Sequence, residues 1–224
     1  MKIINAGYEE MMPVDGLFLL KQIEFAGRVC YKSEEKITDD SCFKFVRTLI
    51  KRGHEAMLEH GPNLSVKFIT DRGVTHEIVR HRLFSFAQES TRYCNYGGDD
   101  ITFILPCWFH DKYFEVCNGE IISSVEESKM WIDGPELVWF SSMLQAEDAY
   151  QKLIKQNWTP QQARSVLPNS LKTEIIVTGN IRQWRHFFKL RSAKNAHPQM
   201  QEIACALLKD WKEKYPVVFE DIAI

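Results

Sequence analysis

The chain of 224 residues carries 28 Lys and Arg against 30 Asp and Glu, a formal net charge of -2. Because non-specific nucleic-acid binding usually needs a basic face, this balance argues against a nucleic-acid partner, although it allows a local basic pocket. The hydrophobic content of 45% is that of an ordinary globular protein, and the length favours a single domain over residues 1–224.

Targeting signals and membrane spans are not expected. No run reaches about 18 apolar residues, the minimum for a membrane-spanning helix. The first residues lack the apolar core of a secretory signal. The six cysteines contain no C-x-x-C pair, so free thiols in a cytoplasmic protein are the expected state.

The N-terminal half is predicted to begin with helices. Apolar residues recur at helical spacing after Asp15, and a second helix is predicted over 38–51. Apolar and polar residues then alternate over 63–70, which predicts a half-buried strand. A helix through 74–82 is expected to follow, with Asp71 as its N-cap.

The C-terminal half is predicted to alternate between strands and helices in the same way. The expected elements are a short strand over 101–105, helices over 135–156 and 161–166, a strand over 172–178, and helices over 181–191 and 198–214. This order predicts an α/β or α+β fold with a small sheet, and leaves the pairing of the strands open.

The run 80–96, RHRLFSFAQESTRYCNY, is the most informative part of the chain. The guanidiniums of Arg80, Arg82 and Arg92 repel one another unless an anion lies among them. Arg is also the side chain best shaped to bind phosphate through two parallel hydrogen bonds. Hydroxyl, amide and phenol groups in the same run add oriented donors and acceptors that suit a polar ring. The run therefore predicts a site for a phosphorylated small molecule.

A second basic cluster lies further along the chain. It comprises Arg164 and a helix with its N-cap that carries Asn180, Arg182, Arg185, His186 and Arg191. Arg182 and His186 are four residues apart and share a helical face. The helix start offers backbone N–H groups to a phosphate or pyrophosphate. A solvated basic helix edge is the alternative, but the first cluster favours a shared anionic ligand.

Three other candidate sites are weaker. In the segment 53–60, GHEAMLEH, the second His follows the first by six residues rather than the four of H-E-x-x-H. A hydrogen-bonding loop around a polar cofactor is therefore favoured, and no metal site is predicted. Cys107 is interpreted as a buried apolar thiol rather than a nucleophile. Ser90 lacks a G-x-S-x-G elbow and is interpreted as a ligand hydrogen-bonding group. Without G-x-G-x-x-G or a P-loop, any dinucleotide would be held outside those frames.

Arg80-His81-Arg82, followed after seven residues by Ser90, resembles the R-H-R-x7-S signature of the flavin-dependent thymidylate synthases. Four further segments are similar to motifs of that family in the same order. They are G-H-E-x-x-x-E-H over 53–60, A-R-x-V-L-P over 163–168, N-x-R followed by L-R between 180 and 191, and A-H-P-Q with E-I between 196 and 203.

The resemblance implies the fold of the thymidylate synthase-complementing proteins, in which helices flank a central, largely antiparallel sheet. It implies a homotetramer with FAD and dUMP bound at subunit interfaces. The implied reaction converts dUMP to dTMP. Its carbon comes from 5,10-methylenetetrahydrofolate, NADPH reduces the FAD, and no cysteine nucleophile takes part.

The resemblance also implies roles for individual residues. Arg191 would be catalytic, lying against the pyrimidine and stabilising negative charge when N3 ionises. The dUMP-binding residues would be Glu77, Arg80, Gln88, Glu89, Ser90, Thr91, Arg92, Arg164 and Arg191. The FAD-binding residues would be His54, Glu59, Arg80, His81, Arg82, Gln88, Asn180, Arg182 and His186. Glu77 stands where some members carry Gln, and its carboxylate would repel a phosphate unless it turned away.

Two other functions remain open from the sequence. A relative of the family could act on another pyrimidine nucleotide or transfer another one-carbon unit. A nucleotide-binding or RNA-binding protein could use the same arginines for affinity alone. The near-neutral charge and the five ordered motifs favour the flavin-dependent enzyme.

Overall fold

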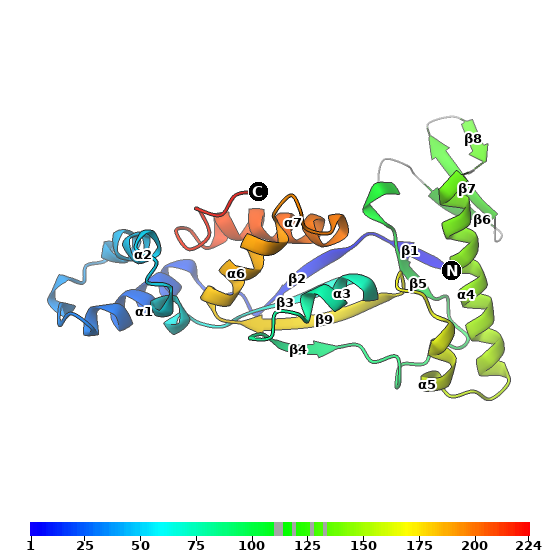
Figure 1. Cartoon of the computed structure of the whole chain (residues 1–224), viewed down its shortest axis with the longest axis horizontal. Coiled ribbons are helices and arrows are strands. Elements are labelled where there is room, and N and C mark those ends of the chain that lie inside the picture. The colour runs from blue at the N-terminus through cyan, green and yellow to red at the C-terminus, as the bar shows by residue number, and fades with distance from the viewer. Residues whose placement is uncertain (110–113, 118–119, 126–127, 132–133) are drawn as a thin grey trace. The chain divides into compact units, whose positions relative to one another are not determined.

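A computed structural model describes residues 1–109, 114–117, 120–125, 128–131 and 134–224 (Figure 1). The chain forms two compact units, each built from three segments. The first unit contains Met1–Gly7, Ile69–His76 and Gln88–Glu174, and the second contains Tyr8–Phe68, Glu77–Ala87 and Ile175–Ile224. The single domain predicted over residues 1–224 stays a prediction. In the described ranges, no helix has both the length and the apolar character needed to cross a membrane.

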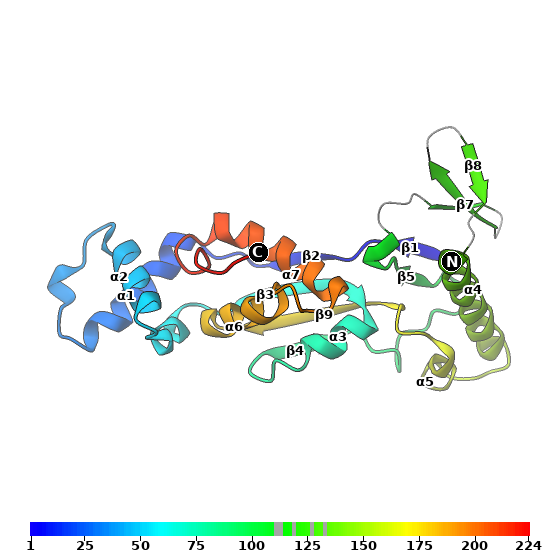
Figure 2. The same cartoon turned by 45° about the horizontal axis from the view of Figure 1, so that its top comes forward.

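A four-stranded sheet carries strands from widely separated parts of the chain. Its order is β2 (Gly7–Met11), β3 (Leu64–Asp71), β9 (Lys172–Gly179) and β4 (Ser85–Gln88) (Figures 1 and 2). Burial alternates along β3, as the apolar alternation in its sequence predicts, and it alternates along β9 as well. The predicted α+β fold with a largely antiparallel sheet and flanking helices is confirmed.

The helices of the second unit match the predictions closely. They are α1 (Gly16–Val29), α2 (Ser41–Lys51), α6 (Ile181–Arg191) and α7 (Pro198–Lys214), with 3-10 turns η1 (Glu34–Lys36) and η2 (Glu55–His60). The Asp15 carboxylate accepts from Phe18 N at 2.7 Å, and the Asn180 side chain accepts from Gln183 N at 3.0 Å. These side chains satisfy backbone donors that a helix start leaves free, which explains why both helices begin there.

An aromatic core holds α6 in place. Trp184, Phe187 and Phe188 are fully buried, because positions three and four apart along α6 share one face. The Trp184 ring lies 4.9 Å from that of Trp211 on α7, in an edge-to-face arrangement. On the other side, Trp184 Nε1 donates to the Leu64 carbonyl of β3 at 3.0 Å. The helix that carries most of the second basic cluster is therefore rigidly fixed.

The first unit has its own core. Strand β1 (Lys2–Ile4) pairs in parallel with β5 (Thr102–Ile104), and the long helix α4 (Gly134–Lys155) packs nearby through Met143 and Tyr150. The remaining elements of this region are η3 (Cys107–Phe109), an antiparallel sheet of β6 (Phe114–Cys117), β7 (Glu120–Val125) and β8 (Ser128–Trp131), and the short helices α5 (Pro160–Ala163) and η4 (Arg164–Val166).

The helix predicted through 74–82 is the main difference from expectation. The observed α3 spans Arg72–Ile78 and ends before Arg80 and Arg82. Beyond it, Arg80 N donates to the Glu77 carbonyl at 3.3 Å and His81 N to the Ile78 carbonyl at 3.1 Å, which forms tight turns instead of further α-helix. The Glu77 carbonyl also accepts from Arg191 Nη2 at 2.9 Å. A distant side chain therefore takes part in ending this helix. Six strands were not predicted, namely β1, β2, β4, β6, β7 and β8.

Candidate active site

The residues predicted as ligands divide between the two units. The second unit carries His54, Glu59, Glu77, Arg80, His81, Arg82, Asn180, Arg182, His186 and Arg191. The first unit carries Gln88, Glu89, Ser90, Thr91, Arg92 and Arg164.

Arg191, at the end of α6, is held from three directions. Its Nη1 donates to Glu77 Oε2 at 2.7 Å, its Nη2 to the Glu77 carbonyl at 2.9 Å, and its Nε to His81 Nε2 at 2.9 Å. Three of the five guanidinium N–H groups are engaged in this way, which leaves two for a ligand. The Arg191 side chain is 19% exposed, so solvent still reaches it. The guanidinium is thus oriented before any ligand binds.

His81 is a neutral partner of this guanidinium. Burial, together with the positive charges of Arg191 and His186, lowers the pKa of His81 to about 4. Because Nε2 accepts from Arg191, the ring proton of the neutral form is placed on Nδ1. The ring also lies 5.1 Å from that of Phe187 and 5.8 Å from that of His186. His81 therefore orients Arg191 without adding a charge.

Glu77 is turned toward Arg191, and the pair balances one negative with one positive charge. The Glu77 side chain is 33% exposed, an exposed fraction close to that of a surface side chain. The repulsion of a phosphate that the sequence raised for Glu77 is weakened, because the arginine neutralises the carboxylate.

Arg80 and Arg82 lie in the turn that follows α3, and both are exposed. Neither pairs with a carboxylate in the ranges that the structure describes. The turn is anchored by Phe84, whose ring lies 4.7 Å from that of Trp184. A β-carbon on Gly179 would sit 2.1 Å from Phe84 Cδ1, so glycine is required there for this packing. Two unpaired guanidiniums on an anchored turn are suited to an anionic ligand.

The segment η2, which follows the predicted ligand His54, is tied to α6 by ion pairs. Glu59 Oε1 lies 2.6 Å from Arg182 Nη1, and Glu55 Oε1 lies 2.9 Å from Lys189 Nζ. The hydrogen bond from Lys189 is the main reason why the pKa of Glu55 is lowered. His54 and His186 are exposed. These contacts fix the predicted flavin-binding residues of η2 against those of α6.

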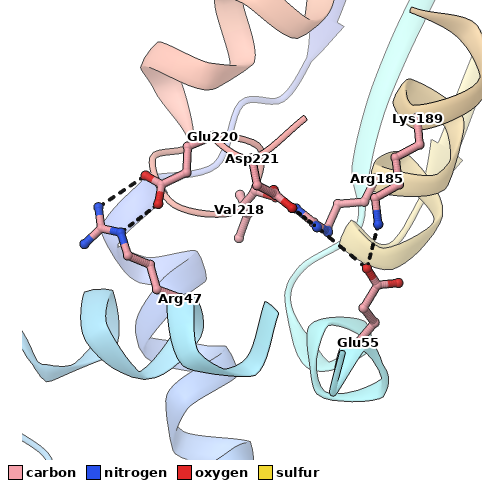
Figure 3. Close-up of polar contacts among 7 residues, drawn as sticks. All are labelled: Arg47, Glu55, Arg185, Lys189, Val218, Glu220 and Asp221. Atoms are coloured by element: carbon pink, nitrogen blue, oxygen red, sulfur yellow. Dashed lines mark hydrogen bonds and ion pairs between the residues drawn. The ribbon is translucent and has the colours of Figure 1, made fainter. Parts of the chain in front are cut away.

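Arg185 is buried, unlike the other basic residues of α6, and Figure 3 shows it beside the C-terminal loop. Its side chain is 1% exposed and donates to the Val218 carbonyl and to both Asp221 carboxylate oxygens, at 2.6 and 2.8 Å. Glu55 Oε1 lies 3.6 Å from it. Although burial raises the pKa of Asp221, the Arg185 hydrogen bonds bring it below its ordinary value. Arg185 therefore fastens the C-terminal loop, and its inclusion in a ligand-facing cluster was wrong.

In the first unit, side chains fix the residues that follow β4. Gln88 Nε2 donates to Thr75 Oγ1 at 3.0 Å and to Thr173 Oγ1 at 3.3 Å. Glu89 accepts from the Tyr96 hydroxyl at 2.7 Å and lies 3.4 Å from Lys172 Nζ. Both residues are thus held by the side chains around them.

Ser90 and Arg92 lie in the turn that follows. Ser90 Oγ accepts from Arg92 N at 3.3 Å, and the Ser90 carbonyl accepts from Tyr93 N and Cys94 N. The exposed guanidinium of Arg92 lies 5.4 Å above the Tyr93 ring. Arg92 is therefore accessible to a ligand, while Ser90 stabilises the turn.

Arg164 and the buried Thr91 meet at a cavity of about 390 Å³, where Arg164 Nη1 donates to Thr91 Oγ1 at 3.2 Å. Arg72 also lines this cavity, and the sequence reasoning missed it. A signal was available, since Arg72 stands in the first turn of α3, where the helix dipole disfavours a cation. A cation in that position indicates a role other than helix stabilisation.

Residues 19–217 match the family model of the "Thymidylate synthase complementing protein". The chain belongs to this family. It is 31% identical over 204 residues to a flavin-dependent thymidylate synthase of Corynebacterium efficiens, and 33% identical over 213 residues to that of Mycobacteroides abscessus. Both matches cover 90% of this chain and 79% of the relative. The resemblance deduced from the five motifs is therefore confirmed.

A solved structure supports the family fold independently. The UMP/dUMP methylase PolB from Streptomyces cacaoi, bound with 5-Br dUMP, superposes with a TM-score of 0.75. The match covers 98% of this chain and 96% of PolB at 22% sequence identity. At this identity the likeness establishes the fold, while the ligand roles of individual residues in this family member stay predictions.

Proposed function

We propose that this family member is a flavin-dependent thymidylate synthase that methylates dUMP reductively to dTMP. The observation that carries the proposal is the fixed guanidinium of Arg191. Glu77 and His81 orient it, and two of its N–H groups remain for a ligand. Relatives at 31–33% identity bear this enzyme name, which supports the same activity here.

Arg191 would act on the pyrimidine ring. Loss of the N3 proton leaves negative charge on the ring, and a guanidinium already in place stabilises that charge without reorganising. The ring then becomes electron-rich at C5, where the new carbon is attached. Glu77 keeps Arg191 in this orientation. His81 also holds it, and because His81 is neutral it does not attract the ring anion itself. No protein nucleophile is needed in this scheme.

The basic residues fit a flavin dinucleotide. Arg80 and Arg82, exposed and without a carboxylate partner in the described ranges, suit its pyrophosphate, while Arg182 and His186 line the same face of α6. Bound FAD would supply the hydride that reduces the transferred carbon, after its own reduction by NADPH. Methylenetetrahydrofolate would provide that carbon.

The nucleotide would bind through the residues after β4. Arg92 and Arg164 suit its phosphate, while Gln88 and Ser90 offer donors and acceptors for the ring and sugar. We propose a homotetramer in which neighbouring chains share these sites. A cytosolic location is in keeping with five free cysteines among the described side chains.

Absorbance and product analysis test the proposal. The purified protein should be yellow or should take up added FAD, and anaerobic NADPH should bleach it. With labelled methylenetetrahydrofolate and dUMP it should form labelled dTMP. A colourless protein that fails to bind FAD would overturn the proposal. Gel filtration with light scattering tests the tetramer.

One observation raises UMP as a second candidate substrate. The superposed PolB is a methylase of both UMP and dUMP. The same assay with UMP in place of dUMP distinguishes a dUMP-specific enzyme from one that accepts both nucleotides. An enzyme that accepts both would turn over UMP at a rate comparable to that for dUMP. We expect dUMP to be preferred strongly.

A further inference from the structure

The cavity at Arg164 has an unusual lining. Its polar lining residues carry two guanidiniums, two hydroxyls and two amides, and they are Arg72, Arg164, Thr91, Ser165, Gln161 and Asn169. No carboxylate lies among its lining residues in the described part of the chain. Two positive charges around one space of about 390 Å³ repel each other unless an anion joins them.

Arg72 is anchored through its backbone, and one nitrogen of its guanidinium makes no hydrogen bond to the described residues. Its N–H donates to the Asn169 carbonyl at 2.9 Å and lies 3.2 Å from the Leu171 carbonyl, which ties the start of α3 to the cavity wall. Its Nη1 is buried and has no hydrogen-bond partner among the described residues. A buried donor on a charged group that makes no hydrogen bond destabilises the folded protein. A buried donor of this kind needs an explanation, and a ligand in the adjoining cavity supplies one.

Arg164 supplies the second half of the arrangement. Its Nη1 donates to Thr91 Oγ1, so the hydroxyl hydrogen of Thr91 is free to donate in turn. Thr91 is only 5% exposed, which fixes the position of that hydroxyl. Donors from two guanidiniums and one hydroxyl are the set that a tetrahedral dianion accepts.

We propose that Arg72 is a phosphate-binding residue, which together with Arg164 and Thr91 clamps the phosphate of the nucleotide substrate in this cavity. This inference rests on the proposed function for the identity of the nucleotide. It adds a residue that none of the predicted ligand sets contains. The ligand is a phosphate monoester, whose two negative charges balance the two guanidiniums. The pyrophosphate of a flavin dinucleotide is the other source of the same chemistry.

The test compares Arg72→Gln with Arg52→Gln. Arg52 is exposed at the end of α2 and does not line the cavity, so its replacement removes the same charge without changing the cavity lining. Titration calorimetry measures the affinity for dUMP and for inorganic phosphate, and competition assays measure deoxyuridine, which lacks the phosphate. Arg72→Gln should reduce the affinity for dUMP and for inorganic phosphate by roughly tenfold or more, because it loses a charge-assisted hydrogen bond. Deoxyuridine should be unchanged, and Arg52→Gln should behave as wild type.

The variant Arg72→Lys tests whether a folding defect explains the loss of binding. It keeps the charge and loses the planar fork, so it should recover part of the dUMP affinity with an unchanged thermal transition. Unchanged dUMP affinity in Arg72→Gln would overturn the inference. An equal loss of affinity for dUMP and for deoxyuridine would overturn it as well. Loss of FAD with normal dUMP binding would instead assign the cavity to the flavin. A wild-type protein without methylase activity, but with Arg72-dependent phosphate binding, would overturn the proposed function and leave the anion site standing.

Discussion

The guanidinium of Arg191 and the carboxylate of Glu77 meet at 2.7 Å, although 114 residues separate them in sequence. The same guanidinium also donates to the Glu77 backbone carbonyl. One residue therefore both balances the charge of Arg191 and fixes its plane. A preorganised guanidinium stabilises charge without paying for reorganisation during the reaction.

Replacing Arg191 with Lys should reduce kcat by roughly a hundredfold or more while the protein stays folded. Lys carries the charge but cannot reproduce the planar set of donors that Glu77 and His81 orient. Steady-state turnover measures the loss, and circular dichroism verifies the fold. Near-normal turnover would remove Arg191 from the catalytic role.

Two replacements of Glu77 should separate orientation from charge. Glu77→Gln keeps an oxygen for Arg191 and should reduce kcat by about fivefold, the value of about 1 kcal/mol for the charged part of the hydrogen bond. Glu77→Ala removes the acceptor and should reduce kcat clearly further. Equal rates for both variants and wild type would show that Glu77 does not position Arg191.

Stability should fall in acid because of His81. Its pKa of about 4 in the folded protein lies below the value of about 6.5 expected for the unfolded chain, so folding favours the neutral ring. This contribution is complete above about pH 6.5 and is lost as the pH falls toward 4, with a magnitude of about 3 kcal/mol.

Urea unfolding of wild type and His81→Gln at pH 7, 5.5 and 4 isolates this effect. Gln offers an acceptor to Arg191 but does not titrate, so the variant should lose less stability across this range. Parallel pH profiles for the two proteins would contradict a buried neutral His81.

Arg185 should matter for stability rather than for ligand binding. Arg185→Met leaves the Asp221 carboxylate and the Val218 carbonyl without their donor, and should reduce the free energy of unfolding by about 3 kcal/mol. The matched control is Arg47→Gln, which removes an exposed pair to Glu220 on the same C-terminal loop. That change should cost much less stability, because an exposed ion pair contributes little. Similar losses in both variants would refute the distinction.

Ser90→Ala and Cys107→Ala should both retain part of the wild-type turnover. Ser90 stabilises a turn through Arg92 N, and the proposed chemistry uses no covalent protein adduct. Turnover and dUMP affinity are measured together. Complete loss of turnover with intact dUMP binding in either variant would revive a nucleophilic mechanism.

Local signals explain what could be predicted about the fold. The helices after Asp15 and Asn180 begin where a side chain caps backbone N–H groups, and α7 begins at Pro198. The sequence of β3 shows the alternation of a half-buried strand, and β9 was predicted from its β-branched residues. Capping and periodicity act within a few residues, so the sequence displays them directly.

The sequence determined the family and the types of residue that its chemistry requires, because the motifs and their spacing are local. Only the tertiary structure decided which arginines are free. Arg185 is paired with Asp221, and Arg191 is oriented by Glu77 and His81. Arg72 keeps a buried donor that makes no hydrogen bond to the described residues. All these side chains carry the same guanidinium, but Asp221 lies 36 residues from Arg185 and Glu77 lies 114 residues from Arg191. What distinguishes them is burial and pairing, which arise only when distant segments pack together.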